Sequence, residues 1–236
     1  MSLNEYNNLL DRYVKLLFEK NKLIIRDAPY IESKYLFYFG DLMVRELEHN
    51  KIIKELRIKQ NIYENYFGLK REREIRNIQR EIKRQTELLS KKICDLEKKC
   101  ELSRNILTLR EENENNSDLV DSLFLDVISV MHPSIYNLKS DELWQKAKNA
   151  YLNYNIATLR LLKNIKINRV KKFDIVDLKN EIFLLENEIM CMKRRYPYYL
   201  ESNLSSIEWI SSYNKEINNR IKKLESEEKQ IFENLV

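Results

Sequence analysis

The stretch SDLVDSLFLDVISVMHPS, residues 117–134, is an apolar helical pattern that runs directly into a helix-stopping tripeptide. Ser117 is a favourable N-cap, because its hydroxyl can accept hydrogen bonds from the first free backbone N–H groups of a helix. Pro133 disfavours helix at the residue before it, so His132-Pro133-Ser134 predicts the end of this helix at Met131. The helical spacing predicts an inward face that consists of Leu119, Leu123, Phe124, Val127, Ile128 and Met131.

Two more short helices are expected after this tripeptide. Ser140 is a candidate N-cap, and the acidic residues that follow it suit a helix N-terminus. Asn153-Tyr154-Asn155 predicts a turn, with Asn155 placed to cap a short helix that continues through Leu162. The first of these helices is expected to present one apolar face, made of Leu143, Trp144, Ala147, Ala150 and Tyr151. Residues 116–166 are therefore expected to form a small helical module.

The composition of the whole chain favours an all-α fold. Its 236 residues include only 2 glycines and 3 prolines, too few for the many tight turns of a sheet protein. The 42 basic and 37 acidic residues give a net charge of +5, and acids alternate with bases even in the most basic run, residues 70–76. This pattern is typical of a solvated helix surface. A nucleic-acid partner is not expected, because such proteins gather their basic residues on one face.

Long apolar stripes predict long helices on both sides of the module. Asp27-Ala28-Pro29 is expected to end the first helix, because proline disfavours helix at the residue that precedes it. Gly40 lies inside a strong helical pattern and predicts the close approach of a neighbouring helix, whereas Gly68 predicts a turn. The expected long helices cover about residues 3–26, 31 to past 62, 69–112, 171–195 and 204 to the end.

Seven-residue repeats predict that these helices supercoil around one another. Such repeats are formed by Leu178, Leu185 and Met192, and by Ile210, Ile217, Leu224 and Ile231. Chain direction favours an antiparallel pair of the helices 69–112 and 171–195, and Pro197 predicts an antiparallel hairpin of the last two helices. The expected fold is all-α, with long antiparallel coiled-coil helices around the module and with domains at 1–115, 116–166 and 167–236. A heptad stripe fits an intramolecular hairpin and a homo-oligomer equally well.

The sequence contains no pattern that indicates catalysis. It has no Gly-rich phosphate loop, no G-x-S-x-G elbow and no H-E-x-x-H helix, so neither an enzyme nor a cofactor is expected. His49 and His132 lack metal-ligand spacing, and His132 is expected to interact with the last carbonyls of its helix. Cys94, Cys100 and Cys191 form no C-x-x-C pair, which favours free thiols in a reducing compartment. Since no apolar run predicts a secretory signal or a membrane span, the cytoplasm is the expected compartment.

The order of features in residues 116–166 resembles helices II and III of a J-domain. An apolar helix precedes His-Pro-x, and the next helix ends in Ala150-Tyr151, with Trp144 six residues before the alanine. Together with the run 159–162, this segment is similar to a J-domain-like (DnaJ-type) family of Gram-positive, clostridial-type bacteria, in which long coiled-coil helices flank the module. Residues 38–40 and 196–198 stand where that family has aromatic-Gly and aromatic-Pro-Tyr features. The core of the resemblance covers about a fifth of the chain.

The resemblance implies a partner-binding loop at His132, Pro133 and Ser134, above a module core of Phe124, Ile128, Trp144, Ala147 and Tyr151. In working J-domains the His-Pro-Asp loop engages an Hsp70 partner, and basic residues of helix II face an acidic surface of that partner. Ser134 replaces the aspartate, and a serine cannot form a charge-assisted pair with an arginine. The helix 118–131 contains no Lys or Arg, and its three acids, Asp118, Asp121 and Asp126, should repel an acidic partner.

These departures predict a non-enzymatic protein–protein interaction protein, a degenerate J-domain-like co-chaperone or adaptor that does not stimulate Hsp70. Its expected partner is another protein, with contact to Hsp70 weak or lost, and no membrane is expected. One alternative is an active Hsp70 co-chaperone that tolerates Ser134. Another is a plain coiled-coil structural or scaffold protein, which predicts no short helices packed around Trp144 and Tyr151.

Overall fold

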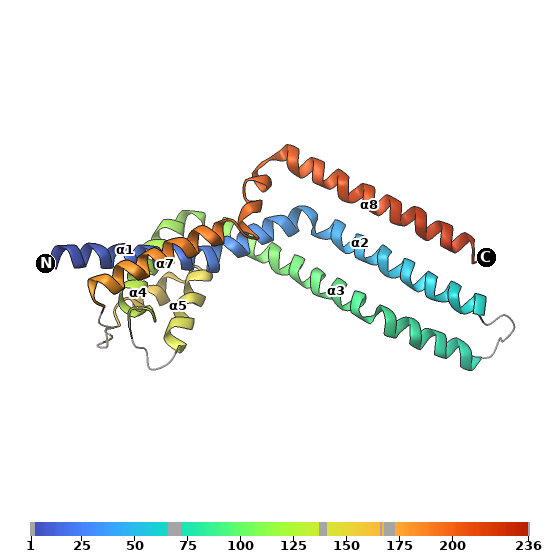
Figure 1. Ribbon diagram of the computed structural model, residues 1–236, viewed down its shortest axis with the longest axis horizontal. Helices are drawn as coiled ribbons and strands as arrows, with labels where there is room; N and C mark the ends of the chain where they lie inside the picture. The colour runs from blue at the N-terminus through green and yellow to red at the C-terminus, as the bar shows by residue number, and fades with distance from the viewer. Residues whose placement is uncertain (1–2, 66–71, 137–140, 166, 168–172, 236) are drawn as a thin grey trace. The chain divides into compact units, whose positions relative to one another are not determined.

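The chain folds as an all-α protein, as its composition predicts (Figure 1). The computed structural model describes residues 3–65, 72–136, 141–165, 167 and 173–235. Gly68, Ser140 and the predicted helix start near residue 171 lie outside these described residues. The α-helices are α1 (Leu3–Lys22), α2 (Ala28–Asn65), α3 (Glu72–Glu112), α4 (Ser117–Met131), α5 (Glu142–Leu152), α6 (Ile156–Leu162), α7 (Ile175–Lys193) and α8 (Ile207–Glu233). Shorter helical turns are the π-helix η1 (Leu23–Asp27) and the 3₁₀ turns η2 (Glu114–Asn116), η3 (Tyr198–Leu200) and η4 (Asn203–Ser205).

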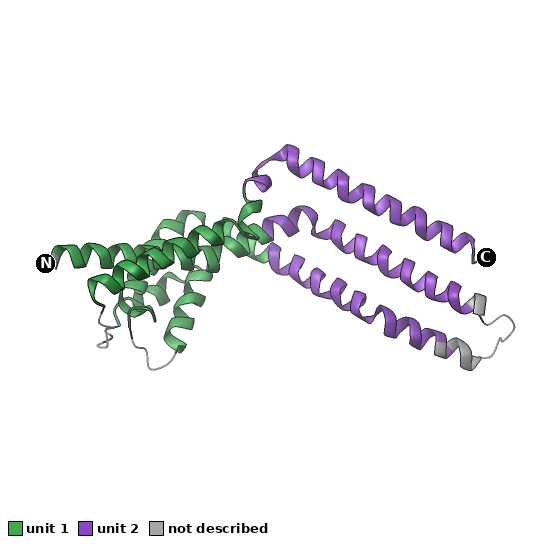
Figure 2. Cartoon of the chain, in the orientation of Figure 1, with its two compact units in different colours: residues 1–32, 105–201 green, residues 33–104, 202–236 purple. Residues whose placement is uncertain are grey.

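Two compact units divide the chain, and each is assembled from segments that are far apart in the sequence (Figure 2). Unit 1 consists of residues 1–32 and 105–201, and unit 2 consists of residues 33–104 and 202–236. The units therefore do not follow the three consecutive ranges that the sequence suggested. Within each unit, a helix from the first part of the chain packs against a helix from the last part.

In unit 1, α1 and α7 lie side by side and run in the same direction (Figure 1). A ladder of three ion pairs joins them: Glu5 to Lys179 at 3.0 Å, Arg12 to Glu186 at 2.5 Å and Glu19 to Lys193 at 2.6 Å. Both members advance by seven residues at each step, which defines a parallel pair in heptad register. The predicted antiparallel pairing of α7 with α3 is wrong, because the charged edge of α7 is used by α1.

In unit 2, α2 lies between α3 and α8 (Figure 1). Helix α3 is antiparallel to α2, as the contacts Asp41–Arg104 (3.2 Å) and Lys54 Nζ–Gln85 O (2.6 Å) show. Helix α8 is parallel to α2, as the contacts Tyr35–Tyr213 (3.1 Å between hydroxyls) and His49–Glu228 (2.8 Å) show. The predicted hairpin of the last two helices is therefore wrong, because α7 packs on α1 in one unit and α8 packs on α2 in the other.

The boundary between α1 and α2 is the π-helical turn η1, and not the break that Pro29 predicted. The backbone N–H of Ala28 donates to Leu23 O, five residues earlier instead of four. Pro29 has no N–H to donate. The backbone hydrogen bonds already span five residues instead of four just before this position, so the helix continues past the missing donor. The chain is consequently helical from Leu3 to Asn65, and α2 begins at Ala28.

Gly40 confirms the close approach of helices that its place in the sequence predicted. A Cβ atom at this position of α2 would lie 2.5 Å from Cys100 Sγ of α3. Real Cβ atoms do not approach a sulfur atom so closely, so the two helices depend on the missing side chain at this point of unit 2.

Candidate functional site

The core of the module is a stack of aromatic rings between α4 and α5. The Phe124 ring lies parallel to that of Tyr151, with centroids 3.9 Å apart, and nearly parallel to that of Trp144, at 5.8 Å. Offset stacking of this kind adds to the stabilisation from apolar burial. The structure buries all five residues expected in the module core: Phe124, Ile128, Trp144, Ala147 and Tyr151.

The inward face of α4 differs from the predicted one at its first position, where Val120 is buried in place of Leu119. Val120 is fully buried, whereas Leu119 is 41% exposed. The buried stripe continues through Leu123, Phe124, Val127, Ile128 and Met131, and a residue one position before Val120 lies about 100° away on the helix. The prediction for Leu119 is therefore wrong. In α5, Leu143 is likewise exposed, while the other four residues of its predicted face are buried.

Two of the predicted caps have different outcomes. Ser117 does not cap α4, because the helix is preceded by the 3₁₀ turn η2 and its N-cap residue is Asn116. The Ser117 hydroxyl instead accepts a hydrogen bond from Arg26 Nη2 at 3.1 Å. Asn155 caps α6 as predicted, since its Oδ1 accepts the backbone N–H of Thr158 at 2.9 Å.

The His-Pro-Ser loop at the end of α4 lies against α1. His132 is 8% exposed, and its ring meets the Trp144 ring edge-on with centroids 4.6 Å apart. Its Nδ1 accepts the backbone N–H of Ser134 at 3.1 Å and therefore carries no proton in this arrangement. Its Nε2 lies 3.2 Å from Asn21 Nδ2 of α1. The His132 ring is thus part of the interior of unit 1.

Ser134 forms a second contact between the loop and α1. Its side chain hydrogen-bonds the hydroxyl of Tyr13, which is itself buried. Burial raises the pKa of Tyr13, the Ser134 hydrogen bond lowers it, and the nearby Glu181 raises it again. His132 and Ser134 are therefore both engaged with residues of their own chain.

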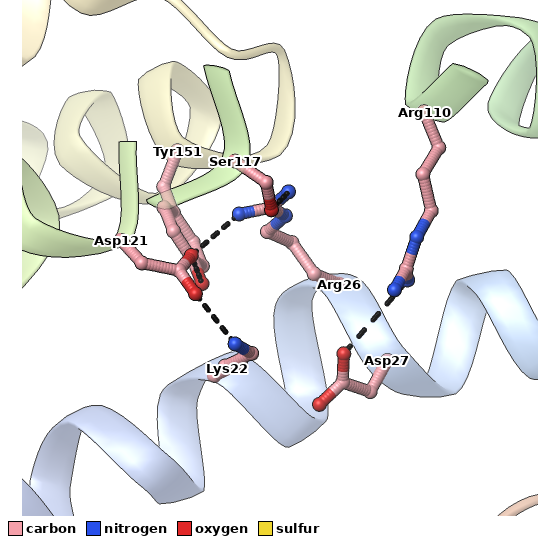
Figure 3. Close-up of polar contacts among 7 residues, drawn as sticks. All are labelled: Lys22, Arg26, Asp27, Arg110, Ser117, Asp121 and Tyr151. Atoms are coloured by element: carbon pink, nitrogen blue, oxygen red, sulfur yellow. Dashed lines mark hydrogen bonds and ion pairs between the residues drawn. The ribbon is translucent and has the colours of Figure 1, made fainter. Parts of the chain in front are cut away.

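A polar cluster around Asp121 fastens α4 to the end of α1, to η1 and to α5 (Figure 3). The Asp121 carboxylate accepts hydrogen bonds from Lys22 Nζ (2.5 Å), Arg26 Nη1 (2.6 Å) and the Tyr151 hydroxyl (2.7 Å). The Arg26 side chain is 5% exposed and that of Asp121 is 16% exposed, so this ion pair is shielded from water. A buried charge needs such complete pairing, because an unpaired one is strongly unfavourable.

The surroundings of Tyr151 hold its hydroxyl in the protonated form. Burial raises the pKa of Tyr151, and the hydrogen bond and negative charge of Asp121 raise it further, against a smaller opposing effect of Arg26. The Arg26 guanidinium lies 4.9 Å from the Tyr151 ring centroid and 4.1 Å from that of Tyr154. These cation–π contacts enclose the apolar faces of the guanidinium that the ion pair leaves uncovered.

A neighbouring ion pair attaches the end of α3 to the same turn of helix (Figure 3). Arg110 Nη1 lies 3.9 Å from Asp27 Oδ1, and its guanidinium lies 3.7 Å from the Tyr30 ring centroid. Burial raises the pKa of Asp27, although the positive charges of Lys22, Arg110 and Arg26 act against that effect. The π-turn is therefore held by charged contacts on two sides.

This cluster was not predicted from the sequence. Its available signal was the pair Lys22 and Arg26, four residues apart on one helix face, and the acid Asp121, which directly follows the buried Val120 of α4. Each is common by itself. Only the fold, which brings residues almost one hundred positions apart into contact, connects them.

The possible metal ligands, the cysteines and the apolar helices bear on the chemistry open to the described residues of the chain. No group of three or more His, Cys, Asp or Glu residues among them could hold a metal ion. Cys94, Cys100 and Cys191 are free thiols, and Cys100 is buried beside Gly40. None of the described helices combines the length and the apolar character needed to cross a bilayer.

Comparison with protein-family models, with characterised proteins and with solved structures gave no match.

Proposed function

We propose that this chain is a non-enzymatic protein-binding protein, a degenerate J-domain-like co-chaperone or adaptor that does not stimulate Hsp70. The observation that carries the proposal is the position of the His-Pro-Ser loop against α1. The ring of His132 is buried against Trp144, and Ser134 is engaged by Tyr13. Side chains held in this way by their own chain are not available to a partner.

The arrangement around Trp144 and Tyr151 supports a J-like module over a plain coiled coil. Helix α4 is followed by the His-Pro-Ser loop and then by the short helices α5 and α6, in the order that the resemblance implies. Both aromatic residues are buried among these helices. An uninterrupted coiled coil lacks the short helices that enclose this tryptophan and this tyrosine.

The charges of α4 argue against an active Hsp70 co-chaperone. The helix contains no basic residue to meet an acidic partner. Asp121 is occupied by Lys22, Arg26 and Tyr151, and Asp126 lies 3.2 Å from Lys163 Nζ. Without a positive patch, electrostatic steering toward an acidic surface is lost. The free thiols agree with the cytoplasm as the place where such a protein would act.

The test is steady-state ATP hydrolysis by the host's Hsp70, with an active J-protein as the positive control. We expect no stimulation by the unaltered chain. We also expect none from Ser134→Asp, because this variant restores the carboxylate but leaves His132 buried and α4 acidic. Stimulation by the unaltered chain that His132→Gln abolishes would make it an active co-chaperone. Stimulation by Ser134→Asp alone would show that the missing carboxylate was the sole defect and that the buried histidine is no obstacle.

A further inference from the structure

The outer face of α7 carries an exposed apolar stripe. Val176 and Phe183 are each 64% exposed, Leu184 is 62% exposed and Met190 is 45% exposed. Val176, Phe183 and Met190 are seven residues apart, so they align along one side of the helix. Single exposed apolar residues are ordinary on protein surfaces, but several that are aligned along one side of a helix indicate a contact surface.

The stripe is not required for the packing of α7 within unit 1. The opposite face of the helix supplies that packing through Leu178, Ile182, Leu185 and Ile189, all of which are buried. Lys179, Glu186 and Lys193 are used by the ion-pair ladder with α1. Helix α7 is therefore apolar on two faces, and among the described residues of unit 1 only one of these faces is covered.

The charges at the two ends of the stripe have opposite signs. Asp177 lies in the first turn of α7, and Arg194 and Arg195 directly follow its last residue. All three residues are exposed, and none of them forms an ion pair within the described parts of the chain. A second α7 would match these charges only if it ran in the opposite direction. A parallel copy would bring Asp177 to Asp177 and Arg194 to Arg194.

We infer that the outer face of α7 is a self-association surface, on which a second copy of this chain docks in antiparallel orientation about a two-fold axis near Leu184. Such an interface is isologous, so each surface patch contacts its own complement. Phe183 and Leu184 lie at the axis, where they meet the same residues of the other copy. Val176 and Asp177 lie opposite the last turn of the other α7, between Met190 of the partner subunit and Arg194 of the partner subunit.

A groove beside α7 extends the surface at its basic end. Leu16 of α1 lines this groove together with Ile189, Met190 and Arg194 of α7. In the antiparallel arrangement, the groove is the place where Val176 and Asp177 of the partner subunit arrive. Glu19 and Glu186 also line the groove, but they are paired with Lys193 and Arg12, so the apolar walls and Arg194 are left to receive an apolar residue that is followed by an aspartate.

This self-association rests on the proposed protein-binding function. It names one protein partner, which is a second copy of the chain. The two experiments have different readouts. A failure to self-associate leaves the Hsp70 result unchanged, and stimulation of Hsp70 leaves the mass of the chain in solution unchanged.

The first test is analytical ultracentrifugation of the full chain, with a monomer mass of 28.7 kDa. A single helix pair forms a small interface, so the concentration series extends to about 0.3 mM. We expect a monomer–dimer equilibrium that Phe183→Glu weakens at least tenfold. The matched control is Leu161→Glu, which places the same charge at another exposed leucine of unit 1, 72% exposed, and should leave the equilibrium unchanged. A monomer at every concentration, or equal effects of the two variants, would overturn the inference.

A charge exchange tests the orientation. Asp177→Arg alone places two arginines opposite each other at both ends of an antiparallel interface and should weaken association several-fold. Arg194→Asp alone should do the same with two carboxylates. The double variant restores opposite charges at both ends and should recover the dimer. If the double variant is no better than the single ones, the antiparallel register is wrong.

Cys191 provides an independent distance test. With the axis near Leu184, the two copies of Cys191 lie about 21 Å apart along the helices, at 1.5 Å per residue. A short thiol cross-linker on a Cys94→Ser background should therefore not join the two chains through Cys191. In the same background, Asp177→Cys should be cross-linked to Cys191 of the partner subunit. Efficient linkage of Cys191 to its own copy would indicate a parallel dimer and overturn the inference.

Discussion

Asp121 connects more of unit 1 than any other single residue of the polar cluster. Its carboxylate receives donors from the end of α1, from η1 and from α5, and the guanidinium of Arg26 that it neutralises is buried. Pairs of this kind do not always stabilise a protein relative to an apolar replacement. Removal of one member, however, leaves the other charge buried without compensation.

We predict that Asp121→Asn lowers the free energy of unfolding by about 3 kcal/mol, because it preserves the shape of the side chain but leaves Arg26 without its counter-ion. Urea unfolding followed by circular dichroism measures the change. The control is Asp118→Asn, which removes an exposed acid from the same helix and should shift stability by less than about 0.5 kcal/mol. Equal effects of the two substitutions would show that the cluster contributes nothing beyond general charge.

Tyr151 predicts a loss of stability in alkali. The ordinary pKa of its hydroxyl is 10.0, and the folded state raises it, so the folded chain holds this proton more tightly than the unfolded chain. The contribution is fully present below pH 10 and is lost as the pH rises through the folded pKa. Above about pH 10, the free energy of unfolding should fall by about 1.4 kcal/mol per pH unit for this group.

Tyr151→Phe should remove the contribution of one titrating proton to the slope of the free energy of unfolding against pH. It should also lower stability at pH 7, because the hydrogen bond to Asp121 is lost. The measurement is urea unfolding of both proteins between about pH 8 and about pH 11. Tyr199→Phe removes the hydroxyl of a tyrosine that is 54% exposed, and it is the control for the loss of a tyrosine hydroxyl outside the Asp121 cluster. An identical slope in Tyr151→Phe would contradict the proposed environment of this hydroxyl.

At the scale of the helices, Gly40 shows a conflict between local preference and packing. Alanine stabilises a helix interior by about 1 kcal/mol relative to glycine. The added Cβ would, however, collide with Cys100 Sγ at 2.5 Å. Overpacking of this kind costs about 1–3 kcal/mol, so Gly40→Ala should have a net destabilising effect in the unaltered chain.

The same substitution should change sign when the sulfur atom is removed. On a Cys100→Ala background we expect Gly40→Ala to raise the free energy of unfolding by up to about 1 kcal/mol, because only the helix preference remains. A double-mutant cycle in urea gives the coupling directly. Additive effects would mean that α2 and α3 adjust without cost, and that the contact does not explain the glycine.

The helices themselves were largely predictable, because their apolar periodicity is a local property. Helices α3, α4, α6 and α7 lie close to where the spacing placed them, and the end of α4 at His132-Pro133 follows from the chemistry of proline. Pro29 was misjudged for a related reason. The sequence shows that a donor is missing there, but a π-turn that absorbs the loss depends on tertiary contacts such as Arg26–Asp121 and Arg110–Asp27.

At the scale of the whole molecule, the partners of the helices could not be read from their apolar stripes. A heptad stripe fits any other heptad stripe, and α1 with α7 joins residues 174 positions apart. The charges beside the stripes did carry a signal. Glu5, Arg12 and Glu19 alternate in sign at seven-residue steps, and Lys179, Glu186 and Lys193 show the complementary alternation. Such complementary edges select partner and direction in coiled coils.

The two tryptophans make the division into units open to experiment, since Trp144 belongs to unit 1 and Trp209 to unit 2. Trp144 stacks on Phe124, and Trp209 stacks on Tyr213, so each indole reports on the packing of its own unit. Trp209→Phe leaves a fluorescence probe for unit 1, and Trp144→Phe leaves one for unit 2.

We predict that Asp121→Asn shifts the urea midpoint seen by Trp144 more than the midpoint seen by Trp209, because its partners all lie in unit 1 and each unit has a buried core of its own. Gly40→Ala should shift the urea midpoint seen by Trp209 more than the one seen by Trp144, since Gly40 and Cys100 both belong to unit 2. Circular dichroism of the same samples checks that the tryptophan substitutions leave the helix content unchanged. Coincident shifts at both probes for both variants would mean that the helices shared by the two units make the molecule unfold as one cooperative body.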